Sequence, residues 1–271
     1  FLKERTETRW LPRLKKSKVQ LEITRFEDLE TKNFIKAIKQ TAFTAAIDES
    51  RPVLTGVKMS FLEEQLQLAA TDGYRLSLKN LNLIKKTAIS TLIIPSKALM
   101  ELARIYTQKK EEERVKISLT KENNQIIFSL GEIEIITRLL EGKFPDFKKI
   151  IPKEGLTKIT IDKKSFQRAV KTAALFAKDS ANIVRLKIKG QKLEMMANAP
   201  EIGENKIELE IKKTGEDGQI AFNCRFLQDY LNILEEDSFV MEFSGPLKPG
   251  LFKPVKEESF FHIIMPVRIQ E

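Results

Sequence analysis

The chain repeats itself at long range. The stretch KNFIKAIKQTAF, which begins at Lys32, recurs as KSFQRAVKTAAL, which begins at Lys164. Two further pairs of segments match in the same order: QLQLAAT (65–71) with KLEMMAN (192–198), and IIPSKAL (93–99) with AFNCRFL (221–227). The members of each pair lie roughly 130 residues apart, far beyond the ~20–50 residues of a solenoid unit. The spacing therefore indicates a duplicated domain.

The length of 271 residues agrees with two domains at the usual ~100–200 residues each. The repeat predicts one domain over 26–152 and another over 153–271, because each copy opens with its helix near the start of these ranges. Residues 1–25 do not fit the repeat. Within them KVQLEI (18–23) alternates polar and apolar residues, which predicts a half-buried strand.

Charge, cysteine content and hydropathy indicate which partners and which kinds of site this protein can have. A net charge of +9 favours a polyanionic partner such as nucleic acid, although a generic lysine-rich surface is the alternative. Cys224 is the only cysteine, which excludes an internal disulfide and a thiolate metal site. No apolar run approaches the ~18 residues of a membrane span, and the basic residues 1–18 lack a signal-peptide core. We expect a soluble, cytoplasmic protein without cofactor or metal.

Hydrophobic periodicity predicts an α+β fold in which short turns join antiparallel strands. Four helices are expected, two per domain, at about 29–46, 96–107, 163–177 and 225–234. The strands are expected at 53–61, 65–71, 74–83, 91–95, 115–119, 125–130, 132–140, 157–162, 184–189, 192–197, 206–211, 219–223, 238–243 and 259–269. Asp72-Gly73 predicts a hairpin turn between two of them. The segment 245–254, with three prolines and two glycines, predicts an exposed irregular loop.

The first helix of each domain carries a basic face. Positive residues recur at i, i+4 and i+7 in both copies, as Lys32, Lys36 and Lys39 and as Lys164, Arg168 and Lys171. Side chains at this spacing share one side of a helix, opposite the apolar stripe. Such a face neutralises phosphates without reading bases; the alternative is an ordinary solvated surface. The matching register in two diverged copies favours a DNA-facing role.

Catalytic constellations are nearly absent from the sequence. His262 is the only histidine and lies inside a predicted strand, and Cys224 has no histidine near it. No glycine-rich phosphate loop or cluster of metal-binding carboxylates is visible. We therefore expect a non-enzyme. The alternative is an enzyme that uses His262 or Cys224, in which case their substitution abolishes turnover.

Four turn segments combine rigid turn residues with apolar ones: RPVLTGV (51–57), ATDGYRL (70–76), EGKFPDF (141–147) and MPVRI (265–269). An apolar cleft bounded by strands and a loop is the kind of site that receives a short linear peptide. These segments therefore favour a peptide-binding cleft, with core packing as the alternative interpretation of Leu54, Leu76, Phe147 and Met265.

Together with IIP (150–152) and AFNCRFLQDYL (221–231), these segments resemble, in order and spacing, the bacterial DNA polymerase III beta subunit, the sliding clamp family. The resemblance covers about 19–271. It implies three similar domains per subunit, each with paired helices on antiparallel sheets. It also implies a head-to-tail homodimer ring around double-stranded DNA, with helices inside and sheets outside. The role implied is that of a processivity factor, and polymerase activity belongs to another subunit of the holoenzyme.

The resemblance also implies a cleft between the middle and C-terminal domains, which docks the replicative polymerase, the clamp loader and repair proteins through a short motif. Carried over by matching motif, the cleft residues are Leu54, Thr71, Gly73, Tyr74, Leu76, Pro145, Lys149, Ile150, Asn223, Phe226, Leu247, Pro249, Ile263, Met265, Pro266, Val267 and Arg268. Their apolar members would form a floor, while Asn223, Lys149 and Arg268 would hold the peptide backbone or a carboxylate.

The sequence also departs from the family pattern. The family's first domain is not visible, so that residues 1–25 are interpreted as a connector or its remnant, and the usual ring would lack one joint. The net charge of +9 is also unusual, because these clamps are commonly acidic outside. The alternative function is a truncated adaptor that binds clamp-binding motifs without encircling DNA.

Overall fold

A computed structural model of the chain describes residues 30–83, 90–108, 115–120, 122, 124–152, 155–178, 180–199 and 203–268. The strand predicted at 18–23 lies outside these ranges. The four predicted helices are confirmed as α1 (Thr31–Ala42), α2 (Ser96–Gln108), α3 (Lys163–Ala177) and α4 (Cys224–Ile233). Two short 3₁₀ helices, η1 (Pro52–Thr55) and η2 (Lys148–Ile150), lie in the connecting segments.

Local sequence explains where the helices begin and which face they bury. The Asp162 carboxylate accepts a hydrogen bond from the backbone N–H of Ser165 at 2.8 Å and so caps α3. The side chain of Asn223 caps α4 in the same way, from the N–H of Arg225 at 3.0 Å. The apolar stripe of α1 is buried, including Phe34 and Ile38.

One antiparallel sheet of nine strands runs through both domains, in the order β12-β8-β14-β15-β16-β3-β2-β1-β4. Its strands are β1 (Gly56–Leu62), β2 (Gln65–Thr71), β3 (Arg75–Asn82), β4 (Ser90–Pro95), β8 (Thr157–Asp162), β12 (Lys212–Gly215), β14 (Ser238–Phe243), β15 (Gly250–Pro254) and β16 (Phe260–Ile264). The domains join where β16 pairs with β3, in a register that sets Ile263 opposite Leu76.

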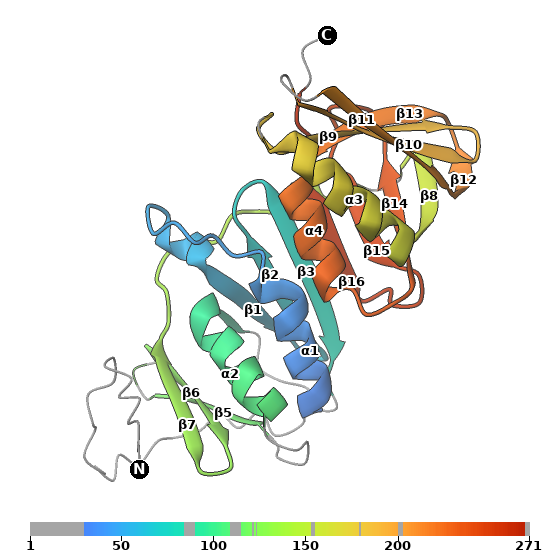
Figure 1. The fold of residues 1–271 in the computed structure, drawn as a ribbon. Coiled ribbons are helices and arrows are strands. Elements are labelled where there is room, and N and C mark those ends of the chain that lie inside the picture. Colours follow the sequence, from blue (N-terminus) through green and yellow to red (C-terminus); the bar gives the residue numbers. More distant parts are fainter. Residues whose placement is uncertain are drawn as a thin grey trace, which may run out of the picture.

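Two smaller antiparallel sheets complete the fold, one in each domain. The sheet β5-β6-β7 comprises β5 (Val115–Leu119), β6 (Gln125–Leu130) and β7 (Ile133–Arg138). The sheet β11-β10-β9-β13 comprises β9 (Ile183–Lys189), β10 (Lys192–Ala199), β11 (Gly203–Glu210) and β13 (Gly218–Asn223). In Figure 1 all four helices lie along one face of the nine-stranded sheet.

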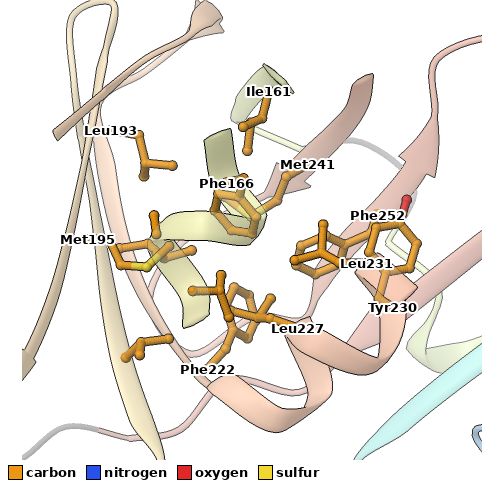
Figure 2. Packing of buried hydrophobic residues seen from close by; sticks show 14 of the residues in the cluster. Ile161, Phe166, Leu193, Met195, Phe222, Leu227, Tyr230, Leu231, Met241 and Phe252 are labelled. Carbon is orange, nitrogen blue, oxygen red and sulfur yellow. The ribbon is translucent and has the colours of Figure 1, made fainter. Parts of the chain in front are cut away.

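Each domain has its own helix-facing core. In the C-terminal half, Phe166 of α3 and Tyr230 of α4 pack against Phe239 and Phe252 of the sheet, with ring centroids 5.3–5.7 Å apart (Figure 2). The other core gathers α1 and α2 against β1, β2 and β6. A third, smaller cluster contains Leu76, Ile263 and Phe147. It spans the junction, because these residues come from both domains.

Two expectations about the C-terminal strands were wrong. The segment 245–254 is not irregular throughout, since Gly250–Pro254 forms β15 in the interior of the sheet. The expected closing strand 259–269 ends at Ile264. Its continuation leaves the β-ladder when the N–H of Met265 bonds to the carbonyl of Tyr74 at 2.8 Å. Pro266 then supplies no N–H for a ladder. The short strand β12 was not anticipated.

Candidate peptide-binding cleft and basic helix face

The hairpin turn between β2 and β3 is held by its own side chains. The Thr71 hydroxyl donates to the carbonyl of Arg75 at 2.6 Å and accepts from the N–H of Gly73 at 3.0 Å. The Asp72 carboxylate accepts from the N–H groups of Tyr74 and Arg75 at 2.9 and 3.0 Å. Gly73 adopts φ +96°, a conformation that favours glycine. The turn leaves the side chain of Tyr74 63% exposed.

The C-terminal tail passes directly beside this turn. After β16 ends, the N–H of Met265 bonds to the carbonyl of Tyr74 at 2.8 Å, and the N–H of Val267 bonds to that of Ala221 in β13, also at 2.8 Å. The tail therefore connects the hairpin turn of one domain to an edge strand of the other. Met265, Pro266 and Val267 are half-buried, so each presents part of its side chain at this junction.

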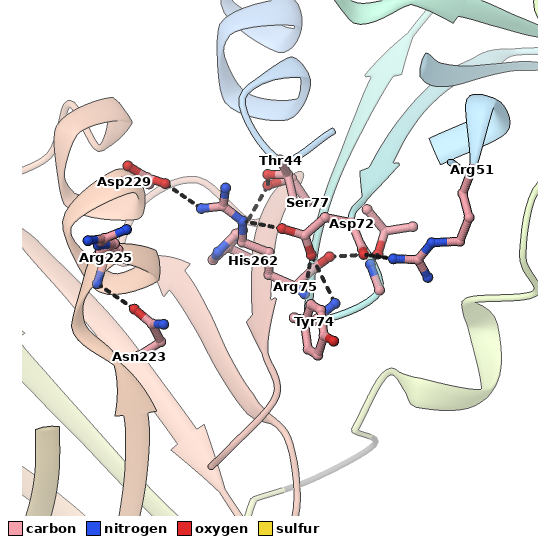
Figure 3. A network of polar contacts seen from close by, with 12 residues as sticks. Thr44, Arg51, Asp72, Tyr74, Arg75, Ser77, Asn223, Arg225, Asp229 and His262 are labelled. Atoms are coloured by element: carbon pink, nitrogen blue, oxygen red, sulfur yellow. Dashed lines mark hydrogen bonds and ion pairs between the residues drawn. The ribbon is translucent and has the colours of Figure 1, made fainter. Parts of the chain in front are cut away.

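Arg75 joins the two domains at the same place, and it is not among the cleft residues predicted from the sequence. Its guanidinium bonds to Asp72 at 2.9 Å and to Asp229 of α4 at 2.5 Å (Figure 3). It also lies over the ring of Phe226, with the Cζ atom 4.5 Å from the ring centroid, and 5.7 Å from that of Phe43. Arg75 thus positions Phe226 relative to the hairpin. Its place beside Tyr74 in ATDGYRL is the one sequence feature by which it could have been found.

Contacts at this junction involve eight of the predicted cleft residues, namely Thr71, Gly73, Tyr74, Leu76, Phe226, Ile263, Met265 and Val267. The predicted residues differ in depth. Thr71, Leu54, Leu76 and Ile263 are buried. Asn223, Phe226, Pro249, Met265, Pro266 and Val267 are half-buried, and Gly73, Tyr74, Pro145, Lys149, Ile150, Leu247 and Arg268 are exposed. Tyr74 exposes a large side chain at the hairpin turn, and Ile150 and Leu247 do so in η2 and in the segment before β15. The buried Leu76 and Ile263 lie opposite each other in the pairing of β3 with β16.

The segment around η2 contributes to the junction. Ile151, directly after η2, packs against the cluster that contains Leu76 and Ile263, while the neighbouring Ile150 is exposed. The segment that carries Leu54 is linked to the hairpin because Arg51 donates to the carbonyl of Asp72 at 3.1 Å. The Lys149 ammonium lies 3.9 Å from a carboxylate oxygen of Asp146.

Two predicted residues also line cavities of their own. Pro145 borders a groove of about 940 Å³ formed by β4 and the connecting segment, in which the Lys58 ammonium lies 5.5 Å from the ring centroid of Phe147. Arg268 borders a separate pocket of about 500 Å³ beside β9 and β10.

The basic helix face differs between the two copies. Lys164, Arg168 and Lys171 of α3 are exposed, as predicted for a solvent-facing row. In α1, Lys32 is exposed and the Lys39 ammonium donates to the hydroxyl of Thr107 at 3.0 Å. Lys36 is only half-exposed and bonds to two carboxylates of the other domain, Glu235 at 3.2 Å and Glu257 at 3.0 Å.

The acidic partners of Lys36 were not visible in the sequence because they lie about 200 residues away along the chain. Burial acts to lower the pKa of Lys36, but hydrogen bonds and charges from Glu257 and Glu235 raise it above its ordinary value. Lys36 therefore contributes mainly to the domain junction, and α3 carries the freer positive charge.

His262 and Cys224 are core residues in this fold. His262 is fully buried, its Nδ1 lies 2.8 Å from the hydroxyl of Ser77, and its ring stacks on Tyr230 at 5.4 Å. Burial lowers the pKa of His262 to about 3. Burial raises the pKa of the Cys224 thiol. Neither group has the exposure that a nucleophile or general base requires.

In the part of the chain that the structure describes, no three His, Cys, Asp or Glu side chains are grouped in a way that would hold a metal ion. None of the described helices is long and apolar enough to cross a membrane.

Comparison with known families matches nearly the whole described chain. The family model for the DNA polymerase III beta subunit, central domain, matches residues 28–146, and the model for its C-terminal domain matches 148–268. Among curated proteins, the beta sliding clamps of Staphylococcus aureus and Staphylococcus epidermidis are each 34% identical over 242 residues. These matches cover 89% of this chain but 63% of the relatives, so the chain spans less than two thirds of their length.

Solved structures give the same result. The DNA polymerase III beta chain of Streptococcus pneumoniae superimposes with a TM-score of 0.86 at 33% identity, covering 97% of this chain and 69% of that one. The DNA polymerase sliding clamp of Bacillus subtilis superimposes with a TM-score of 0.85 at 30% identity, covering 96% and 67%. The predicted fold class is confirmed by these similarities.

Proposed function

Because the chain belongs to the DNA polymerase III beta subunit family, we propose that it serves as part of a sliding clamp. In this role it is a non-catalytic processivity factor that encircles double-stranded DNA and docks partner proteins by short peptide motifs. The partners proposed are the replicative polymerase subunit, the clamp loader and other proteins with the same motif. A second copy of the subunit closes the ring, and the site of action is the cytoplasm.

The geometry of the junction between the two domains supports the proposal that the protein docks peptides. Three independent connections converge there: the pairing of β16 with β3, the bond from Met265 to Tyr74, and the contact of Arg75 with Asp229 and Phe226. They hold the hairpin turn, on which Tyr74 is exposed, against the C-terminal tail and α4. A preformed apolar surface bounded by a strand end and a loop suits an extended peptide.

The arrangement of the helices supports the DNA-binding part. All four helices lie along one face of the long sheet (Figure 1), and the exposed basic row of α3 belongs to that side. Contacts between such a row and phosphates are electrostatic and independent of sequence. They weaken with salt, which suits a protein that slides.

Fluorescence polarization with a labelled clamp-binding peptide tests the docking surface. Met265→Ala and Phe226→Ala are each expected to weaken binding at least tenfold, about 1.4 kcal/mol. Val255→Ala is the control, since Val255 is an exposed apolar residue that follows β15 and was not assigned to the cleft. Unchanged affinity in both cleft variants would place the docking site elsewhere.

Loading by the clamp loader onto nicked circular DNA tests encirclement. A ring that is retained on circular DNA and lost when the DNA is linearised supports the clamp. Peptide binding by a strict monomer that is never retained on circular DNA would favour the alternative, a clamp-like adaptor.

A further inference from the structure

A basic pocket opens beyond the end of the candidate cleft. It has a volume of about 500 Å³ and lies where β9 and β10 meet the C-terminal tail. Its charged lining comprises Arg185 of β9, Arg268 of the tail and Glu204 of β11, and Met196 supplies apolar surface. Both arginine side chains are exposed.

Backbone pairing connects this pocket to the cleft. The N–H of Val267 bonds to the carbonyl of Ala221 in β13, and Ala221 pairs in register with Arg185 in β9. The tail residue Arg268 follows Val267 directly, while Met265 lies two residues before it, against Tyr74. One short segment therefore borders both the apolar junction and the basic pocket, so a chain lying on the junction would reach the pocket by continuing along the tail.

Among the described residues, none forms an ion pair with either guanidinium group. Within the described ranges, no ion pair or side-chain hydrogen bond involves Arg185 or Arg268, and Glu204 on the rim pairs with neither. Farther along the same sheet, lysines do have acidic partners: Lys192 bonds to Glu208 at 2.6 Å, and Lys206 bonds to Glu194. In register, Arg185 faces Met196 on one side and Ala221 on the other. Its charge is therefore available to a ligand.

The position of the pocket favours a peptide over DNA. Val184 and Leu186 of β9 are buried in the core that also contains α3, so Arg185 between them points to the opposite face of the sheet. The exposed basic row of α3 lies on the helix side. A guanidinium recognises a carboxylate through a bidentate, charge-assisted hydrogen bond.

We propose that this pocket binds a carboxylate of the docked partner, from an acidic residue just outside its apolar motif. The inference rests on the proposed peptide docking and extends it, because it assigns a preference for acidic flanking residues to Arg185 and Arg268. Partners that share the same apolar motif would then differ in affinity according to the charge of the neighbouring residues.

Matched peptides test the proposal by fluorescence polarization. The peptide used for the docking assay is extended, before or after its motif, by two glutamates or by two glutamines. At one of the two ends we expect the glutamate form to bind about three- to fivefold tighter than its glutamine twin, as for one exposed ion pair. Arg185→Gln should abolish that difference and leave the glutamine twin unchanged. Lys187→Gln is the control, two residues along β9 and on the same face.

A second variant acts in the opposite direction. Glu204→Gln removes the one acidic group of the pocket and should increase the preference for the glutamate peptide. Equal binding of the two twins, or a preference that survives Arg185→Gln, would overturn the proposal. Failure of the glutamine twin to bind would instead refute the peptide docking on which it rests. If Arg185→Gln weakens duplex DNA binding as much as Arg168→Gln does, the pocket serves phosphate and the peptide assignment is wrong.

Discussion

His262 shows how one residue depends on the junction that surrounds it. Its Nδ1 lies 2.8 Å from the Ser77 hydroxyl, which lies 2.7 Å from that of Thr44, so three segments meet at one buried chain of polar atoms (Figure 3). Phe43 and Tyr230 lie on the ring, each with its centroid 5.4 Å away. These surroundings favour the neutral imidazole, because burial disfavours the ionised form.

The buried His262 should make the protein sensitive to mild acid. Its pKa is about 3 when folded and 6.5 in the ordinary state, so the unfolded chain binds a proton below pH 6.5 that the folded chain does not. His262 therefore does not lower the free energy of unfolding well above pH 6.5. The free energy of unfolding falls as the pH drops from 6.5 towards 3. Between pH 6.5 and 5 we expect a loss of up to about 2 kcal/mol, measured by urea unfolding at each pH.

His262→Gln separates this effect from that of the carboxylates. The variant should be less stable at pH 7 because it repacks the core, but its stability should stay nearly flat between pH 6.5 and 5. Carboxylates titrate mostly below about pH 4.5, outside this window. An equal loss of stability in the variant and the parent protein would show that another group is responsible.

At the scale of the elements, β15 shows why a strand was mistaken for a loop. Its flanking glycine and prolines predict irregular backbone, yet Leu251 and Phe252 pair with β14 and β16 and are buried. Gly250 is required by close packing, since a Cβ there would lie 2.5 Å from the Phe222 ring. Gly250 therefore lies at a close contact with Phe222, and close approach of this kind is a common reason for glycine within a strand.

The packing at Gly250 leads to a stability prediction. Gly250→Ala should lower the free energy of unfolding by about 1–3 kcal/mol, because the added methyl group must displace the ring of Phe222. Thermal unfolding measures the change. Leu247→Ser, in the exposed turn three residues earlier, should leave the melting temperature nearly unchanged. Equal stability of the Gly250→Ala variant and the parent protein would mean that the core yields more easily than this contact indicates.

The exposed basic row of α3 leads to a prediction about DNA. Replacing Lys164, Arg168 and Lys171 by glutamine should weaken association with duplex DNA at low salt and flatten its salt dependence, because fewer counterions are released. Electrophoretic mobility shifts at several salt concentrations measure this. A control with Lys158, Lys187 and Lys189 replaced removes the same charge from exposed strand positions. Equal loss in both would indicate a general effect of net charge.

At the scale of the whole molecule, a polar cluster fastens the two domains on the helix side. The Glu257 carboxylate, before β16, bonds to Lys79 of β3, to Lys36 of α1 and to Gln40 of α1. Burial acts to raise the pKa of Glu257, but the hydrogen bonds from Lys79, Gln40 and Lys36 lower it below its ordinary value. The two domains are therefore connected both by the pairing of β3 with β16 and by this cluster.

Removing the shared carboxylate should loosen the junction. Glu257→Gln leaves the side chain of Lys79, only 6% exposed, without its charged partner, and we expect a loss of about 2 kcal/mol of stability. Scanning calorimetry should show a lower melting temperature and a broader transition as the domains uncouple. Glu258→Gln, at the neighbouring exposed position, is the control. A sharp, unshifted transition in Glu257→Gln would assign the coupling to the sheet alone.

The sequence by itself determined the local elements, because their causes are local. The apolar stripe around Phe34 and Phe166, the cap at Asp162, the Asp72-Gly73 turn and the alternating strands each follow from neighbours a few residues away. The same patterns, ordered along the chain, led to the clamp family. They also selected residues such as Tyr74 and Met265, which the structure places side by side.

Only the tertiary structure decided which charges are free and which surfaces are open. Lys36 and Lys164 occupy equivalent places in the repeat, yet Glu235 and Glu257 neutralise the first, while the second is exposed. The fold likewise brings Arg75 to Asp229 and places Arg185 and Arg268 in one pocket. The members of these pairs lie about 80–220 residues apart in the chain. Sequence periodicity reflects only neighbours a few residues away, so it cannot predict contacts that form when the two domains pack together.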